Sequence, residues 1–151
     1  MDVVFQIIVG IVIAAASSLI TVRLSRHQFR SELWWEKKVV AYERVIDAFH
    51  HSRKFSSEHF QAALKSRELP KEREEELRKL AGQASDEIKR ASDVGSFLLS
   101  DEALKILARY EAEVEKLDDC ESWYKYLEAD LIVTGKYMQE FLVESQRDLK
   151  R

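Results

Sequence analysis

The chain has 151 residues, of which 34% are charged and 46% hydrophobic, and its net charge is −3 at pH 7. This length suits one domain of ordinary size with one additional element. Four glycines and one proline are too few for a many-stranded protein, so long helices are expected. The weak negative charge argues against nucleic-acid binding by bulk charge, and no DNA partner is expected. The single cysteine, Cys120, excludes an intrachain disulfide and suits a reducing cytosol.

An uncharged apolar segment occupies the N-terminus. No ionisable side chain occurs between Val3 and Val22, which is about the 20 residues that a helix needs to cross hydrocarbon. A secretory signal peptide is the alternative, but no basic residue precedes the segment and arginines follow it. These are Arg23, Arg26 and Arg30. The positive-inside rule then places residues 25–151 in the cytoplasm and the N-terminus outside, with residues 1–24 as a transmembrane anchor.

Small and polar residues recur along this predicted span. They are Gln6, Gly10, Ala14, Ser17 and Thr21, at spacings of 4, 4, 3 and 4 that place them on one helical face. Small residues let helices in lipid approach closely, and polar side chains hydrogen-bond between them. Glycine, serine and threonine are also common in spanning helices that have no partner. The stripe predicts self-association, with these five residues at the helix contacts or lining a pore.

A long helix is expected to continue from the span, because no helix breaker occurs between Thr21 and Pro70. A seam for bundle packing is predicted along it, with spacings of 4, 3, 4 and 3: Trp35, Val39, Tyr42, Ile46 and Phe49. A second stripe, which begins at Trp34, widens the apolar face. Trp34 and Trp35 are too far beyond the span for an interfacial belt, and we expect them in the core or between subunits. Trp35 and Ile46 are predicted to be buried.

Three further helices are predicted from their boundary residues. Pro70 suits the first position of a helix that continues to about Asp93 and ends at Gly95. Ser100 suits the N-cap of the next helix, and a fourth follows Asp119. The predicted fold class is therefore all-α, a single N-terminal transmembrane helix that continues into a cytoplasmic four-helix bundle with up-and-down connections.

No phosphate loop, zinc-ligand cluster or dinucleotide fingerprint occurs in the sequence, so no metal and no cofactor is expected. One pattern carries chemistry: five residues separate Arg44 from His50, and six separate it from His51. An arginine four to six residues before a histidine resembles the motif of HEPN (higher eukaryotes and prokaryotes nucleotide-binding) domains. In that family the arginine steadies a phosphate and the histidine acts on the ribose 2′-hydroxyl or the leaving group. The alternative is a solvated polar surface with no catalytic role.

The chain as a whole resembles a small group of single-span bacterial membrane proteins. The resemblance lies in the span, the Trp-Trp-Glu-Lys-Lys sequence at Trp34–Lys38, the Arg–His spacing and the helical remainder. These proteins accompany RNA-targeting type VI CRISPR systems or other phage-defence genes. The resemblance implies a HEPN-like cytosolic bundle, a place in the bacterial inner membrane, and assembly into oligomers that enclose a pore.

The leading hypothesis is accordingly a membrane-anchored homo-oligomer that perturbs the membrane during phage defence. Its expected partners are membrane lipid, further copies of the chain and a protein of the defence system. Two alternatives stay open. One is a membrane-tethered ribonuclease that uses Arg44 with His50 or His51 and therefore binds RNA. The other is a non-catalytic adaptor that recruits a partner to the membrane.

Overall fold

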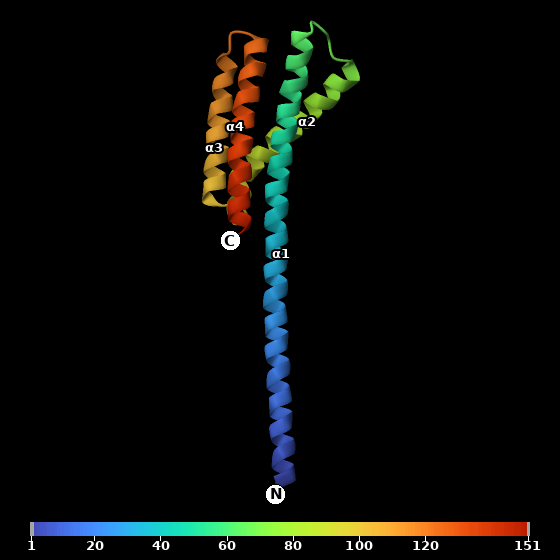
Figure 1. Cartoon of the computed structure of the whole chain (residues 1–151), viewed down its shortest axis with the longest axis vertical. Helices are drawn as coiled ribbons and strands as arrows, with labels where there is room; N and C mark the ends of the chain where they lie inside the picture. The colour runs from blue at the N-terminus through green and yellow to red at the C-terminus, as the bar shows by residue number, and fades with distance from the viewer. Residues whose placement is uncertain (1, 151) are drawn as a thin grey trace. The chain divides into compact units, whose positions relative to one another are not determined.

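A computed structural model describes residues 2–150, with side chains described for residues 32–95 and 97–150. Its α-helices follow one another as α1 (Asp2–Leu64), α2 (Lys71–Val94), α3 (Asp101–Glu115) and α4 (Trp123–Leu149) (Figure 1). Two short 3-10 helices, η1 (Gly95–Phe97) and η2 (Lys116–Asp119), lie in the connections before and after α3. No strand occurs among residues 2–150, so the predicted all-α class is confirmed.

The chain divides into two compact units, Met1–Lys37 and Lys38–Arg151, and α1 contributes to both. The second unit is a helical bundle made from the C-terminal part of α1 with α2, α3 and α4. No helix within the described residues is long and apolar enough to cross a membrane. The span predicted at residues 3–22 lies outside the part of the chain whose side chains are described, and it stays a prediction.

The end of α1 is a hydrogen-bonded turn centred on Ser66. This residue has a φ of 48°, in the left-handed region that helices commonly use to terminate. The Ser66 N–H donates to the Ala63 carbonyl at 3.1 Å, and the Arg67 N–H donates to the Ala62 carbonyl at 2.9 Å. These two bonds satisfy carbonyls that the last turn of a helix leaves open. The chain can then reverse into α2.

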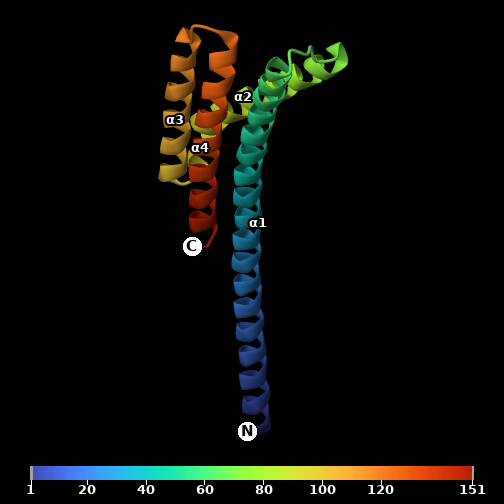
Figure 2. The same ribbon diagram turned by 45° about the horizontal axis from the view of Figure 1, so that its top comes forward.

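Helices α2, α3 and α4 begin close to the predicted positions. Pro70 precedes the first residue of α2 rather than occupying it, a shift of one position. Ser100 caps α3 as predicted, since its Oγ accepts the Ala103 N–H at 3.1 Å. In both views α3 and α4 lie side by side and antiparallel, while α2 runs obliquely to the start of α3 (Figures 1 and 2).

The core of the bundle lies where all four helices meet. Aromatic rings occupy its centre: Phe49 packs on Tyr110 with ring centroids 4.9 Å apart and on Phe141 at 5.8 Å, and Tyr42 packs on Phe141 at 5.5 Å. Aliphatic side chains complete it, among them Val45, Ile88, Ile106 and Leu107. Burying each large apolar side chain contributes about 1.5–3 kcal/mol, so this cluster is the main source of the bundle's stability.

The predicted seam of α1 is correct at Tyr42 and Phe49 and wrong at Trp35. The Trp35 side chain is 56% exposed and that of Trp34 is 53% exposed, so neither belongs to the core of the chain. Ile46 is only partly buried and packs against the core from outside. Helix α4 covers α1 only as far as Tyr42. The Tyr42 hydroxyl bonds to Asp148, which lies one residue before the last residue of α4. The apolar pattern of α1 includes Trp34 and Trp35, whereas its buried face does not.

Candidate functional site

Helix α1 carries the three residues of the Arg–His hypothesis. Arg44 and His50 are exposed and His51 is half-buried. The rings of His50 and His51 lie 5.9 Å apart, but consecutive helical positions differ in direction by about 100°. The His51 Nδ1 is buried and has no hydrogen-bond partner within the described part of the chain. The proximity of the two imidazoles follows from their adjacent positions in α1, and none of the three residues is among the described lining residues of the cavity below.

Five residues also separate Arg53 from His59, and His59 belongs to an aromatic cluster. Arg53 is exposed, whereas His59 packs 4.3 Å from the Phe55 ring and 6.0 Å from the Trp123 ring, measured between centroids. Burial lowers the pKa of His59 below its ordinary value, because the cluster removes the imidazole from water. A neutral, packed imidazole supports the contact between α1 and α4 more than it suits phosphate chemistry.

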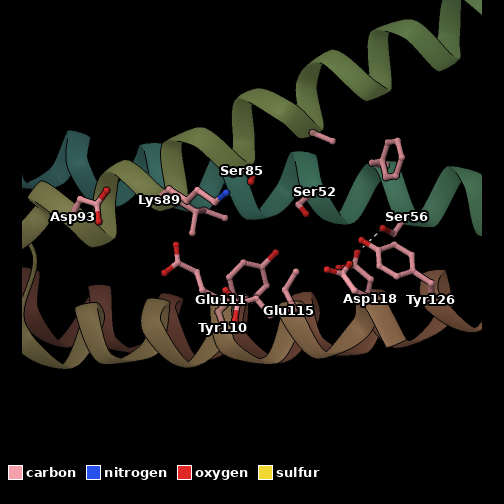
Figure 3. Close-up of a pocket in the computed structure, with 15 residues that line it drawn as sticks. Ser52, Ser56, Ser85, Lys89, Asp93, Tyr110, Glu111, Glu115, Asp118 and Tyr126 are labelled. Carbon is pink, nitrogen blue, oxygen red and sulfur yellow. Dashed lines mark hydrogen bonds between the residues drawn. The ribbon is translucent and has the colours of Figure 1, made fainter. Parts of the chain in front are cut away.

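An interhelical cavity of about 540 Å³ lies within the bundle (Figure 3). Side chains from α1 and α2 enter it on one side and side chains from α3, η2 and α4 on the other. Its apolar and aromatic lining is Phe55, Ala81, Ile88, Tyr110, Val114 and Tyr126; its hydroxyl and charged lining is Ser52, Ser56, Ser85, Lys89, Asp93, Glu111, Glu115, Asp118 and Asp130. A volume of this size suits a small-molecule site.

One of the residues that line the interhelical cavity, Asp130, has a buried carboxyl group. The Asp130 side chain is 4% exposed; its Oδ2 accepts the Ser56 hydroxyl at 2.5 Å and its Oδ1 accepts the Thr134 hydroxyl at 3.3 Å. The Tyr110 hydroxyl lies 3.4 Å from the same threonine oxygen. Burial raises the pKa of Asp130, since the hydroxyl bonds compensate only part of the lost hydration. Within the described residues this carboxyl group interacts with hydroxyls and not with a basic partner.

Further carboxylates form the rim of the cavity. Glu111 and Glu115 lie on one face of α3, and Asp118 follows in η2. Among the described lining residues, Lys89 alone is basic. Burial raises the pKa of Tyr126, and the charges of Asp130 and Asp118 raise it further. The interior of the cavity therefore carries a negative potential that is only partly compensated.

The described lining of the cavity contains carboxyl groups, hydroxyls and one lysine, and no histidine is among these residues. In the part of the chain that the structure describes, no group of three His, Cys, Asp or Glu side chains could hold a metal ion. Cys120 is a half-buried free thiol outside the lining.

No known protein family, curated protein or solved structure matches this chain. The assignment of a function therefore rests on the residues themselves. The five residues of the predicted polar stripe, Gln6, Gly10, Ala14, Ser17 and Thr21, lie outside the residues whose side chains are described.

The spacing of apolar residues predicts an inward stripe on α4 at Trp123, Leu127, Leu131, Met138 and Leu142, and such a stripe does not indicate a cavity. The buried face of that helix is mixed, and at spacings of 4, 3, 4, 4 and 3 it carries Asp130, Thr134, Tyr137, Phe141, Ser145 and Asp148. Of the predicted inward residues, Leu127 is fully buried, whereas Leu131, Met138 and Leu142 are only half-buried and Trp123 is 54% exposed. The available signal was a polar residue at helical spacing from large aromatic ones, a pattern that indicates buried hydrogen bonds.

Proposed function

We propose that this chain is a membrane-anchored protein that assembles with further copies of itself and perturbs the bacterial inner membrane during phage defence. The proposed anchor is the uncharged segment at residues 3–22, and the arginines after it support a cytoplasmic position of the bundle. The resemblance of the chain to single-span membrane proteins of defence loci supports the biological role. In this proposal neither Arg44 nor the histidines catalyse a reaction.

The observation that carries the proposal is an exposed apolar segment on α1. Leu33, Trp34 and Trp35 are 44%, 53% and 56% exposed, although large apolar side chains at consecutive positions are costly to hydrate. Large exposed apolar side chains gathered in one segment are typical of interaction sites. Because the segment follows the predicted anchor on the same helix, copies gathered through their spans would present these side chains to one another. The occupant of this surface is therefore a second copy of the chain.

The experiment is a mass measurement on the detergent-purified full-length chain. The wild-type chain is expected as an oligomer, and a Trp34→Ser, Trp35→Ser double variant as a smaller species. The matched control is Phe97→Ser, because Phe97 is 77% exposed but lies in η1. A monomeric wild-type chain would overturn the proposal in favour of the adaptor alternative.

The predicted polar stripe is tested in the same preparation. Gly10→Leu adds bulk where helices would approach, and Gln6→Leu removes a polar link worth about 0.6–2 kcal/mol per contact. Both variants are expected to reduce cross-linking in membranes and dye leakage from cells, whereas Ile8→Leu on the opposite face is expected to be silent. Equal behaviour of all three would remove the stripe from the proposal.

The ribonuclease alternative is tested by incubating the purified chain with RNA. We expect no cleavage that depends on Arg44, His50 and His51. Metal-independent cleavage that disappears when all three are replaced by Ala would replace this proposal with the nuclease.

A further inference from the structure

The interhelical cavity has a line of carboxylates along one wall. Glu111 and Glu115 are separated by one turn of α3, and Asp118 follows three positions later. At 1.5 Å of rise per residue, neighbouring carboxylates lie about 5–6 Å apart along the helix axis and the line extends over roughly 11 Å. Glu115 and Asp118 are exposed, so this wall opens to solvent. A ligand with several positive charges at regular intervals would match such a line.

Aromatic and aliphatic side chains form another part of the cavity lining. The rings of Phe55, Tyr110 and Tyr126 line it, together with the aliphatic side chains of Ile88 and Val114. Aromatic faces attract ammonium groups, and apolar walls accommodate methylene chains. A linear ligand can therefore place its hydrocarbon against these walls while its charged groups face the carboxylates.

The charged residues that line the cavity favour a positively charged ligand. Five carboxyl groups line it, and Lys89 is the one basic side chain among its described lining residues. An anion would be repelled. A bare metal ion also fits poorly, because no group of three metal-ligating side chains occurs in the described part of the chain. Burial raises the pKa of Tyr110, and the charges of Asp130 and Glu111 raise it further, which is consistent with uncompensated negative charge.

We propose that the interhelical cavity binds a linear aliphatic polyamine, with ammonium groups on the Glu111–Glu115–Asp118 line and at Asp130 and with methylenes against Phe55 and Tyr126. Three or four methylenes between ammonium groups give a charge spacing comparable with one helical turn. Asp130 can accept an ammonium hydrogen bond beside those from Ser56 and Thr134, because each carboxylate oxygen has two lone pairs. This inference goes beyond the proposed membrane function and does not depend on it.

The experiment is a calorimetric titration of the purified full-length chain with spermidine at physiological salt. Saturable binding is expected at one site per chain. Glu115→Gln and Asp130→Asn are each expected to weaken it by about tenfold, since each removes a charge-assisted hydrogen bond. Glu115 is exposed, so its substitution leaves the fold intact, and the melting temperature of both variants is measured alongside.

The charge-matched control is Glu128→Gln, an exposed residue of α4 outside the cavity, which is expected to bind spermidine as the wild-type chain does. Butylamine, with one ammonium group, is expected to bind much more weakly than spermidine. Three outcomes would overturn the proposal: the absence of saturable binding to the wild-type chain, an equal loss in Glu128→Gln, or unchanged binding in the folded Glu115→Gln variant.

Discussion

The hydroxyl of Tyr42 on α1 donates a 2.6 Å hydrogen bond to Asp148 Oδ2 near the end of α4, 106 positions further along the chain. The Tyr42 hydroxyl oxygen also accepts the backbone N–H of Ser100 at 3.0 Å, and Lys38 pairs with Asp148 Oδ2 at 2.9 Å. Burial raises the pKa of Tyr42 to about 12, and the bond to Asp148 adds to the rise, so the hydroxyl remains protonated at neutral pH. One side chain thus links α1, the start of α3 and the end of α4.

Replacing this hydroxyl should destabilise the bundle. Tyr42→Phe keeps the ring packing on Phe141 but leaves the Ser100 N–H without its acceptor. We expect the free energy of unfolding to fall by about 1–3 kcal/mol, measured by urea unfolding followed through helical circular dichroism. Tyr124→Phe is the control, because Tyr124 is 39% exposed. Equal midpoints for the two variants would show that the Tyr42 hydroxyl contributes nothing to stability.

The two serine N-caps should differ in their contributions. Ser100 Oγ accepts the Ala103 N–H at 3.1 Å and also donates to Glu144 Oε1 at 2.7 Å. Ser122 Oγ accepts only the longer bond from the Lys125 N–H, at 3.3 Å, on the surface. Ser100→Ala is therefore expected to cost about 1–3 kcal/mol and Ser122→Ala about 0.5–1 kcal/mol in the same unfolding experiment. A larger loss in Ser122→Ala would contradict the role given to the Ser100–Glu144 bond.

The boundaries of α2 and α3 could be predicted because their determinants are local. Pro70 lacks an N–H, Ser100 caps the backbone three positions later, and both effects can be identified from neighbouring sequence. The burial of α4 could not be predicted in this way. Asp130 and Asp148 resemble surface residues until Ser56 and Tyr42 are brought to them from α1, across 74 and 106 positions.

The exposure of Trp34 and Trp35 is a second feature that local sequence could not predict. Their spacing from Tyr42 continues the seam, and tryptophan is normally among the more buried residues. Periodicity identifies which face of a helix is apolar, but not how far along the helix a partner extends. The candidate cavity is a still less local feature, since its lining comes from five elements of the bundle.

Asp130 should make stability depend on pH in a defined direction. Its pKa is raised in the folded chain, so the folded state holds this proton more tightly than the unfolded state. The resulting stability is fully present below the ordinary aspartate pKa of about 3.9 and is lost as the pH rises through the folded value. The groups around it are the hydroxyls of Ser56 and Thr134, and its charge raises the pKa of the nearby Tyr110 and Tyr126 hydroxyls.

Asp130→Asn removes this titration while keeping the shape of the side chain. We expect the variant to match the wild-type chain near pH 4 and to exceed its stability at neutral pH by on the order of 1 kcal/mol, as removal of an unpaired buried charge does. Melting temperatures measured between pH 4 and pH 8 give the difference. Glu128→Gln, an exposed carboxylate on the same helix, is the control and should follow the wild-type curve. A variant that is less stable than wild type at neutral pH would show that Asp130 is stabilised as the anion.

The glycines of α2 and of the turn after it should respond oppositely to alanine. A Cβ added at Gly82, inside α2, would meet nothing within 4 Å, so the substitution only restricts the unfolded chain and favours the helix. A Cβ at Gly95 would lie 2.9 Å from Leu99 Cδ1 and 3.3 Å from Leu104 Cδ2, and both leucines would have to move.

Gly82→Ala is expected to raise the free energy of unfolding by about 0.5–1 kcal/mol. Gly95→Ala should lower it by about 1 kcal/mol or more, because Leu99 is buried in the core. Urea midpoints of the two variants measure the contrast, and a gain in Gly95→Ala equal to that in Gly82→Ala would mean that the core beside Leu99 is looser than its contacts indicate.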